Sequence, residues 1–182
     1  MAIKATVFKA ELQLADLDRG YYADHLLTLA RHPSETDERL MLRVLAFALQ
    51  ARPALAFGDG LSSDDQPDLW EKDLTGAIQL WIDVGLPEDK LVRKACGRAA
   101  QVVVYSYGGH RAELWWAQAK KTLDSIDNLA VYDVPAEASR ALAALAKRNM
   151  QLHCTIQAGQ ALFTDGQSAV QAELVALKTP IT

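Results

Sequence analysis

Cysteine and histidine are scarce in this chain, which has two cysteines and four dispersed histidines among 182 residues. Cys96 and Cys154 lie far apart and belong to no CxxC pair, which excludes a disulfide framework and a cysteine-rich zinc site. No apolar run approaches the ~18 residues of a membrane helix, and the charged first residues do not resemble a signal peptide. We therefore expect a cytoplasmic protein with reduced thiols and no membrane partner.

Familiar catalytic motifs and an excess of positive charge are also missing. The sequence contains no GxGxxG, no Walker lysine loop, no GxSxG and no HExxH. Nineteen basic residues face twenty-three acidic ones, which gives a net charge of -4. Proteins that coat nucleic acid non-specifically are usually basic, so this class is disfavoured, while a local basic patch stays open.

The amino-acid composition is typical of a globular protein. Half of the residues are hydrophobic and 23% are charged, which provides enough apolar material for a sizeable core. The length corresponds to about one domain, and no repeat or linker divides the sequence. We expect a single domain over residues 1–182.

The hydrophobic pattern predicts strands at the N-terminus, then a helix. Apolar and polar residues alternate over 6–13, and a second strand over 21–30 closes a hairpin with the first. Pro33 followed by Ser34 as an N-cap, with acidic residues in the next turns, begins a helix that runs to about residue 51.

Beyond this helix, the pattern predicts three strands, a helix and a strand. These cover residues 54–57, 67–72, 77–84, 88–100 and 102–105, with a polar loop over 62–66. Further elements are expected as helices over 112–123 and 136–148 and strands over 129–132, 150–157, 161–164 and 168–175. The fold class is α/β (α+β), a single domain built on one mixed sheet.

One acidic residue stands in an unusual place on the first helix. Glu38 lies three, four and seven residues before Met41, Leu42 and Leu45, so it shares the apolar stripe. A carboxylate on a buried face is costly unless a cation, a donor network or a metal compensates it. The alternative is a first-turn glutamate that points to solvent and interacts with the helix dipole.

Two further acids lie at the ends of strands that are expected to pair. The turn over 73–76 brings Asp68, after Pro67, level with Asp83 on the next strand. Two close carboxylates repel each other, and a divalent cation relieves that repulsion. Taken singly, each aspartate is an ordinary loop or strand-end residue. Trp81 shares the sheet face of Asp83 and either stacks on a base or packs in the core.

The arrangement of helix, Pro67-Asp68 and Ile82-Asp83-Val84 resembles the core of the PD-(D/E)xK nuclease superfamily. Residues 8–15, 21–49, 67–87 and 93–109 make nearly the whole chain resemble the YaeQ family, which is regarded as a variant of that fold. The resemblance implies an αβββαβ core over about 34–107, extended by an N-terminal hairpin and C-terminal strands.

The resemblance also implies a metal site. Asp68, Asp83 and the carbonyl of Val84 match the ligands that hold Mg²⁺, or Mn²⁺, in these nucleases. Glu38 matches the acid of the first helix, which completes the metal shell through water. Such a metal polarises the phosphate and lowers the pKa of the attacking water.

The chain departs from the nuclease motif at the lysine position, where Gly85 stands. In some members of the superfamily the lysine has moved to the following helix, which makes Lys94, ahead of Lys90, the candidate here. Arg93 and Arg98 are candidate phosphate contacts. A solvated lysine on an amphipathic helix is the plain alternative for Lys94.

Two hypotheses follow from these residues and the resemblance, and a small phosphoester stays open as the substrate of the first. The first is a Mg²⁺-dependent phosphodiesterase, a nuclease, with Asp68 and Asp83 on the metal, Glu38 supporting its water and Lys94 in place of the motif lysine. The alternative is a non-catalytic nuclease-like module that binds nucleic acid or a protein partner, for example in transcription regulation. Gly85 weakens the first hypothesis and favours the second.

Overall fold

The protein is a mixed α+β fold with two β-sheets. The computed structural model describes residues 4–59 and 65–181. Residues 62–64 of the predicted polar loop lie outside this range. In chain order the elements are β1 (Thr6–Asp16), β2 (Tyr21–Arg31), α1 (Asp37–Gln50), β3 (Leu55–Phe57), β4 (Leu69–Lys72), β5 (Ile78–Val84), α2 (Asp89–Arg98), β6 (Ala99–Tyr107), α3 (His110–Leu123), β7 (Leu129–Val134), α4 (Ala136–Ala143), β8 (Asn149–Gln157), β9 (Gln160–Thr164), β10 (Ala169–Glu173) and β11 (Val175–Lys178).

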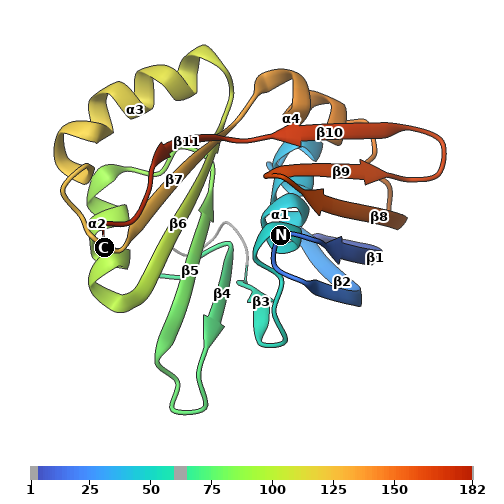
Figure 1. The fold of residues 1–182 in the computed structure, drawn as a ribbon, viewed down its shortest axis with the longest axis horizontal. Coiled ribbons are helices and arrows are strands. Elements are labelled where there is room, and N and C mark those ends of the chain that lie inside the picture. Colours follow the sequence, from blue (N-terminus) through green and yellow to red (C-terminus); the bar gives the residue numbers. More distant parts are fainter. Residues whose placement is uncertain (1–3, 60–64, 182) are drawn as a thin grey trace.

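These elements form layers, with helices α1 and α4 between the two sheets and helices α2 and α3 on the far face of the second sheet (Figure 1). Alternation along β5 explains why the second sheet is buried on both faces. Leu80 and Ile82 join the core shared with α1, whereas Trp81 joins a separate core with α2 and α3. None of the helices in the described residues is long and apolar enough to cross a membrane.

The first sheet has the strand order β10-β9-β8-β1-β2. Strands β1 and β2 pair antiparallel in the predicted hairpin, which is confirmed. On its other side β1 pairs in parallel with β8, more than a hundred residues later. The expectation of one mixed sheet is therefore wrong, because periodicity shows which face of a strand is buried but not which strand lies beside it.

The second sheet has the order β11-β7-β6-β5-β4-β3 and contains the three parallel strands β5, β6 and β7. The order of helix, three strands, helix and strand predicted over 34–107 is confirmed as α1, β3, β4, β5, α2 and β6. Since parallel strands end at the same edge of a sheet, the segments after β5 and β6 meet there. That edge carries the candidate site.

Helix α1 begins later than predicted, and its N-cap is Thr36 instead of Ser34. The Thr36 side chain accepts a hydrogen bond from the Arg39 backbone N–H, with Oγ1 and N 3.1 Å apart. Ser34 lies outside the helix, where its Oγ is 2.6 Å from His32 Nδ1. Glu35 precedes the helix too and is buried, with its Oε1 2.9 Å from Nε of the buried Arg43. The buried pair holds the first turn of α1 against the first sheet.

Two predicted elements near the C-terminus differ from the structure. The helix expected over 136–148 ends at Ala143, because the following backbone N–H groups of Leu145 and Ala146 bond three residues back instead of four. The strand expected over 168–175 is two strands. Strand β10 belongs to the first sheet and β11 to the second, so the end of the chain links them (Figure 1).

Candidate functional site

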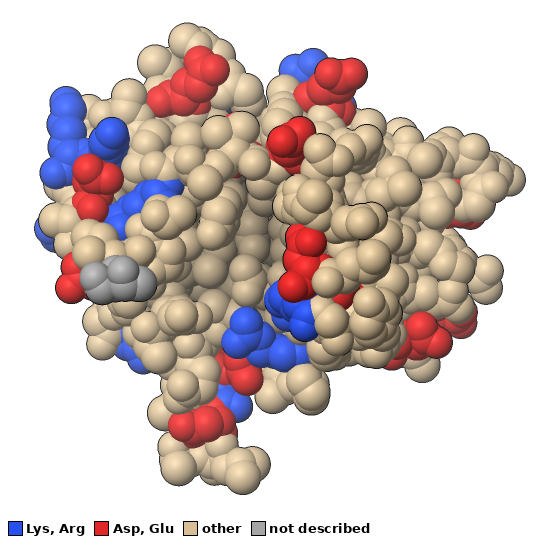
Figure 2. Space-filling view, viewed as in Figure 1, with Lys and Arg blue, Asp and Glu red and all other residues tan. Residues whose placement is uncertain are grey.

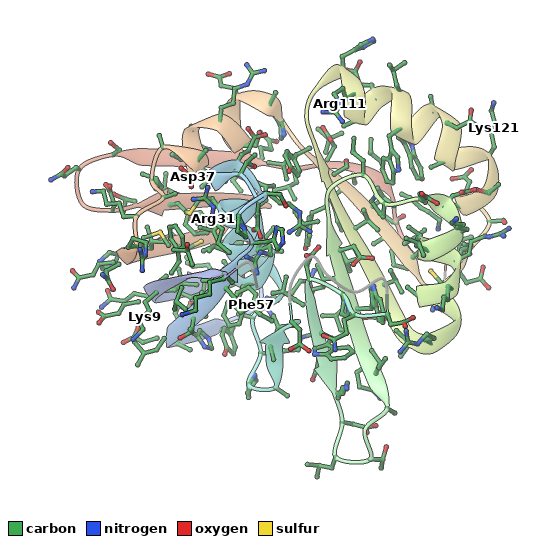
Figure 3. All side chains as sticks on the ribbon, turned by 180° about the vertical axis from the view of Figure 1, so that it is seen from behind. Lys9, Arg31, Asp37, Phe57, Arg111 and Lys121 are labelled. Carbon is green, nitrogen blue, oxygen red and sulfur yellow. The ribbon has the colours of Figure 1, made fainter. Side chains whose placement is uncertain are left out.

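A cavity of about 600 Å³ opens at the carboxyl ends of β5 and β6. The first turn of α1 forms one wall, and the loops after β5 and β6 with the start of α3 form the others. Figure 3 shows Arg111 at the start of α3 and Asp37 at the start of α1, the two helix ends between which the cavity lies. Open α/β sheets commonly bind ligands at this edge.

Four predicted site residues line this cavity: Glu38, Asp68, Asp83 and Val84. The antiparallel register pairs Leu69 with Ile82, so the preceding Asp68 and the following Asp83 are level on neighbouring strands. The expectation that the two aspartates lie side by side is confirmed.

Both oxygens of the Asp68 carboxylate are already hydrogen-bonded within the protein. The backbone N–H of Val84 donates to Oδ2 at 2.7 Å, and Nη2 of Arg39 donates to Oδ1 at 2.6 Å. The Asp68 side chain is 10% exposed and the Arg39 side chain 16%. Solvent screens this ion pair less than a surface pair, so its attraction is correspondingly stronger.

Arg39 contacts two of the predicted metal ligands at once. The same Nη2 that bonds to Asp68 lies 3.3 Å from the carbonyl oxygen of Val84. Nη1 lies 3.7 Å from Oε1 of Glu35. Burial lowers the pKa of the guanidinium, but Asp68 and Glu35 raise it more, so the pKa of Arg39 is raised and the side chain stays charged. A guanidinium therefore supplies the positive charge beside these oxygens.

Asp83 is the most strongly perturbed carboxyl group of the cavity. Burial and, to a smaller extent, the neighbouring Asp68 raise the pKa of Asp83 to about 7, although hydrogen bonding to Trp81 opposes the rise. The Trp81 indole N–H donates to Oδ2 of Asp83 at 2.9 Å, which confirms that the two side chains share a face. A carboxyl group with this pKa exchanges a proton near neutral pH, a property common at functional sites.

Glu38 faces the cavity from α1 and is partly buried. Its Oε1 accepts a hydrogen bond from Ser139 Oγ of helix α4 at 3.1 Å. The donor network that a carboxylate on this face requires is thus supplied in part by a second helix.

Lys94 lies away from these acids and does not line the cavity. Its Nζ is 2.8 Å from Oδ1 of Asp65, and both side chains are largely exposed. Arg98 donates to the backbone carbonyl of the same Asp65, and Arg93 is exposed. Lys90 pairs with Glu88 at 3.0 Å. The structure therefore brings together the predicted acids but not the predicted lysine.

The comparisons with known proteins agree on one family. A sequence model of the YaeQ protein family matches residues 1–174. The chain belongs to the YaeQ family. It is 41% identical to Uncharacterized protein YaeQ of Escherichia coli strain K12 and 40% identical to that of Salmonella typhi, over 99% of each chain.

Two solved YaeQ structures share the fold. The crystal structure of YaeQ from Xanthomonas axonopodis pv. citri has a TM-score of 0.94 and 49% identity, covering 97% of this chain and 99% of that one. YaeQ from Pseudomonas syringae has a TM-score of 0.92 and 35% identity, covering 96% and 97%. The names of these YaeQ proteins state no activity, so a function must be argued from the cavity.

The cavity of this YaeQ-family chain does not fit the implied Mg²⁺ or Mn²⁺ as its side chains stand. Asp68 Oδ1 and the Val84 carbonyl contact a guanidinium, and Asp83 accepts from an indole N–H and has a pKa near neutrality. Within residues 4–59 and 65–181, no group of three or more His, Cys, Asp or Glu side chains is placed to hold a metal ion.

Sequence reasoning missed two residues of this site, Arg39 and Arg111, which both line the cavity. One feature of the sequence places Arg39 near the site: it follows Glu38, and it lies three residues after a threonine that is able to cap the helix. Arg111 lies two residues after Gly109, the N-cap of α3, and two glycines mark a break in the chain from which a helix is able to begin. Neither signal shows that the side chain reaches a cavity.

Proposed function

We propose that this protein is a non-catalytic module of nuclease-like architecture that binds nucleic acid in the cavity without a divalent metal. The observation that carries the proposal is the Arg39 guanidinium, which contacts both Asp68 and the Val84 carbonyl. A permanent protein cation stands where the nuclease resemblance implies a metal, and Glu38, Asp68 and Asp83 line the same cavity.

The backbone of Gly85 supports a binding function over catalysis. Gly85 stands at the position of the motif lysine and has φ of 120°, a conformation that L side chains rarely adopt. A lysine at this position would be strained. Lys94, the predicted replacement, pairs with Asp65 instead.

Arg111 provides the positive group that a phosphate would contact. It is exposed, lines the cavity from the first turn of α3, and pairs with no carboxylate among the described residues. The amino end of α3 has no side-chain cap, so its backbone N–H groups and dipole add to the attraction for an anion. The half-buried Tyr107 ring offers a surface for a base.

The charge distribution limits the number of phosphates that bind. On the face in Figure 2, basic and acidic side chains are interspersed without a continuous basic track. Together with a net charge of -4, this is consistent with a contact that involves few phosphates and is centred on the arginines of the cavity. One or two phosphate contacts give a slope of log K against log salt between about -0.7 and -1.8, shallower than that of proteins that coat long strands.

Fluorescence anisotropy with labelled single strands and duplexes of DNA and RNA tests the proposal. We expect the wild type to bind at least one of these probes in EDTA, with unchanged affinity when Mg²⁺ replaces EDTA and with no cleavage. Arg111→Gln should weaken binding at least about tenfold, because it removes a charge-assisted contact.

The matched control is Lys121→Gln, which removes the same charge from the last turn of the same helix (Figure 3). It should leave the affinity nearly unchanged. Binding to none of the probes would overturn the proposal. Cleavage that requires Mg²⁺ and is lost in Asp68→Asn would replace it with the nuclease hypothesis.

A further inference from the structure

We infer that Arg39 is the resident cation of the cavity and keeps divalent metal ions out of it. This inference goes beyond the binding of nucleic acid, because it concerns the cation content of the site whatever ligand enters. It predicts that removing the guanidinium raises the affinity of the cavity's oxygen atoms for a divalent cation.

The first argument is the position of the charge. Nη2 of Arg39 contacts Oδ1 of Asp68 and the carbonyl oxygen of Val84, at 2.6 and 3.3 Å. A bridging metal ion would bind the same two oxygens, one from each of two neighbouring strands. Guanidinium and metal ion therefore compete for the same partners, and the guanidinium is covalently tethered beside them.

The second argument is how firmly Arg39 is held. Its backbone N–H donates to the Thr36 cap, which fixes the first turn of α1, and its Nη1 lies 3.7 Å from the buried Glu35. Glu35 is itself held by Arg43 through Nε and Nη2. The two carboxylates on either side of the guanidinium hold its charge in place, so a metal ion would have to displace a positioned cation and would be repelled by it.

The third argument concerns what remains when the cation is removed. Arg39→Gln leaves Asp68, Asp83 and Glu38 lining one cavity and removes the cation that contacts Asp68, while Arg111 stays at the start of α3. Oxygen donors of this kind are the ligands that Mg²⁺ and Mn²⁺ prefer. Repulsion between the acids then favours cation binding, as in other clustered carboxylates.

Titration with Mn²⁺, followed by calorimetry and by the electron paramagnetic resonance of free Mn²⁺, tests this inference without an activity assay. We expect Arg39→Gln to bind Mn²⁺ at least about tenfold more tightly than the wild type. Arg39→Lys keeps the charge and should stay close to the wild type. The double variant Arg39→Gln/Asp68→Asn should lose the gain.

A second control removes a different arginine. Arg52 pairs with Glu71 through Nη1 at 2.9 Å, away from the cavity acids. Arg52→Gln also frees a carboxylate from its cation, but Glu71 does not line the cavity with Asp68, Asp83 and Glu38, so no gain in Mn²⁺ affinity is expected. An equal gain in this variant would show that the effect is general charge loss and would overturn the inference.

A folded Arg39→Gln variant with no gain, or a wild type that already binds Mn²⁺ as tightly, would overturn the inference. Circular dichroism and thermal unfolding establish folding of each variant. The wild type alone gives a second measurement, since Mn²⁺ bound beside Asp83 would quench the fluorescence of Trp81. We expect Mn²⁺ to cause no saturable quenching in the wild type. Saturable quenching in the wild type that is lost in Asp68→Asn would contradict the inference, and this test does not require the Arg39 variant to fold. None of these outcomes depends on nucleic-acid binding, so the two proposals fail separately.

Discussion

At the scale of single residues, the backbone of Gly85 decides what its position is able to do. The residue follows β5 with φ of 120°, and its N–H donates to the carbonyl of Tyr105 at 2.9 Å, which fixes it beside β6. A Cβ added there would meet no atom within 4 Å, so the obstacle to a side chain is backbone strain and not space. A lysine at this position, which the nuclease resemblance implies, would therefore be strained.

Gly85→Ala should therefore lower the free energy of unfolding by about 1–3 kcal/mol. The matched control is Gly97→Ala in the exposed part of α2, where φ is not positive and the added Cβ also has open space. That change should raise stability by about 0.5–1 kcal/mol, because alanine favours helix. Urea unfolding of the two variants measures both effects, and equal values would contradict the strain argument.

Asp83 predicts a pH-dependent stability with a definite sign. Its pKa rises from 3.8 to about 7 on folding, mainly through burial. Between these values the folded state binds more protons than the unfolded state, so the free energy of unfolding falls as pH rises and levels off above about pH 7. Asp83 therefore contributes its full stability only at low pH.

Asp83→Asn removes this dependence. Relative to the wild type, the variant should gain stability as pH rises from about 4 to about 7, by roughly 2–4 kcal/mol in total. Urea unfolding of both proteins at about pH 5 and about pH 8 measures the difference. If the difference in unfolding free energy between the variant and the wild type does not grow with pH, Asp83 ionises at its ordinary pKa.

Arg39 shows what sequence reasoning lacks at this scale. Asp68 and Asp83 were predictable as neighbours, because strand register follows from a short turn. The contact of Arg39 with Asp68 was not predictable, because the direction of a long arginine side chain depends on packing around α1. The carboxylates of Glu35 and Asp68, from before α1 and from the start of β4, both attract it.

At the scale of elements, helix α1 positions the site through its first turn. Thr36 caps the helix by accepting from the Arg39 N–H, and that same turn carries Glu38 and Arg39 into the cavity. Most elements were predictable because their periodicity is strong, as in the alternation along β5 or the hairpin of β1 and β2. The sequence predicts Ser34 as the cap because the hydroxyl groups of Ser34 and Thr36 are equally able to accept a backbone hydrogen bond. Only the position at which the helical hydrogen bonds begin distinguishes the two residues.

Thr36→Ala should destabilise the protein by about 1 kcal/mol, since one backbone N–H of the first turn loses its acceptor. Ser34→Ala, two residues earlier and outside the helix, should change stability by less than about 0.5 kcal/mol. Thermal and urea unfolding compare the variants. A larger loss of stability in Ser34→Ala than in Thr36→Ala would show that Ser34, as predicted from the sequence, is the N-cap.

At the scale of the whole molecule, the C-terminal segment links the two sheets. Strand β10 completes the first sheet and β11 pairs with β7 in the second. Lys178 of β11 is buried, and its Nζ donates to the carbonyls of Ile126 and Leu129 at 2.6 and 3.2 Å. The division into two sheets was not predictable from periodicity, since nothing in the alternation of residues 168–175 marks where one sheet ends.

A chain that ends at Leu174 should lose stability because it lacks β11 and the Lys178 contacts. We expect a loss of at least about 1–2 kcal/mol, which corresponds to a fall of roughly 2–8 °C in the unfolding midpoint. A chain that ends at Thr179 keeps β11 and should lose less. Scanning calorimetry distinguishes the two, and equal midpoints would show that β11 contributes nothing to the second sheet.

The parallel pairing of β1 with β8 has a consequence for synthesis. On the ribosome, the amino-terminal hairpin leaves the exit tunnel long before residues 149–157 exist, so one edge of β1 stays unpaired while most of the chain is made. Unpaired strand edges promote aggregation, and such long-range pairing is slow to form. The sheet that the amino-terminal hairpin begins is therefore completed only when residues 149–157 have been made, and until then the free edge of β1 is open to pairing with another chain.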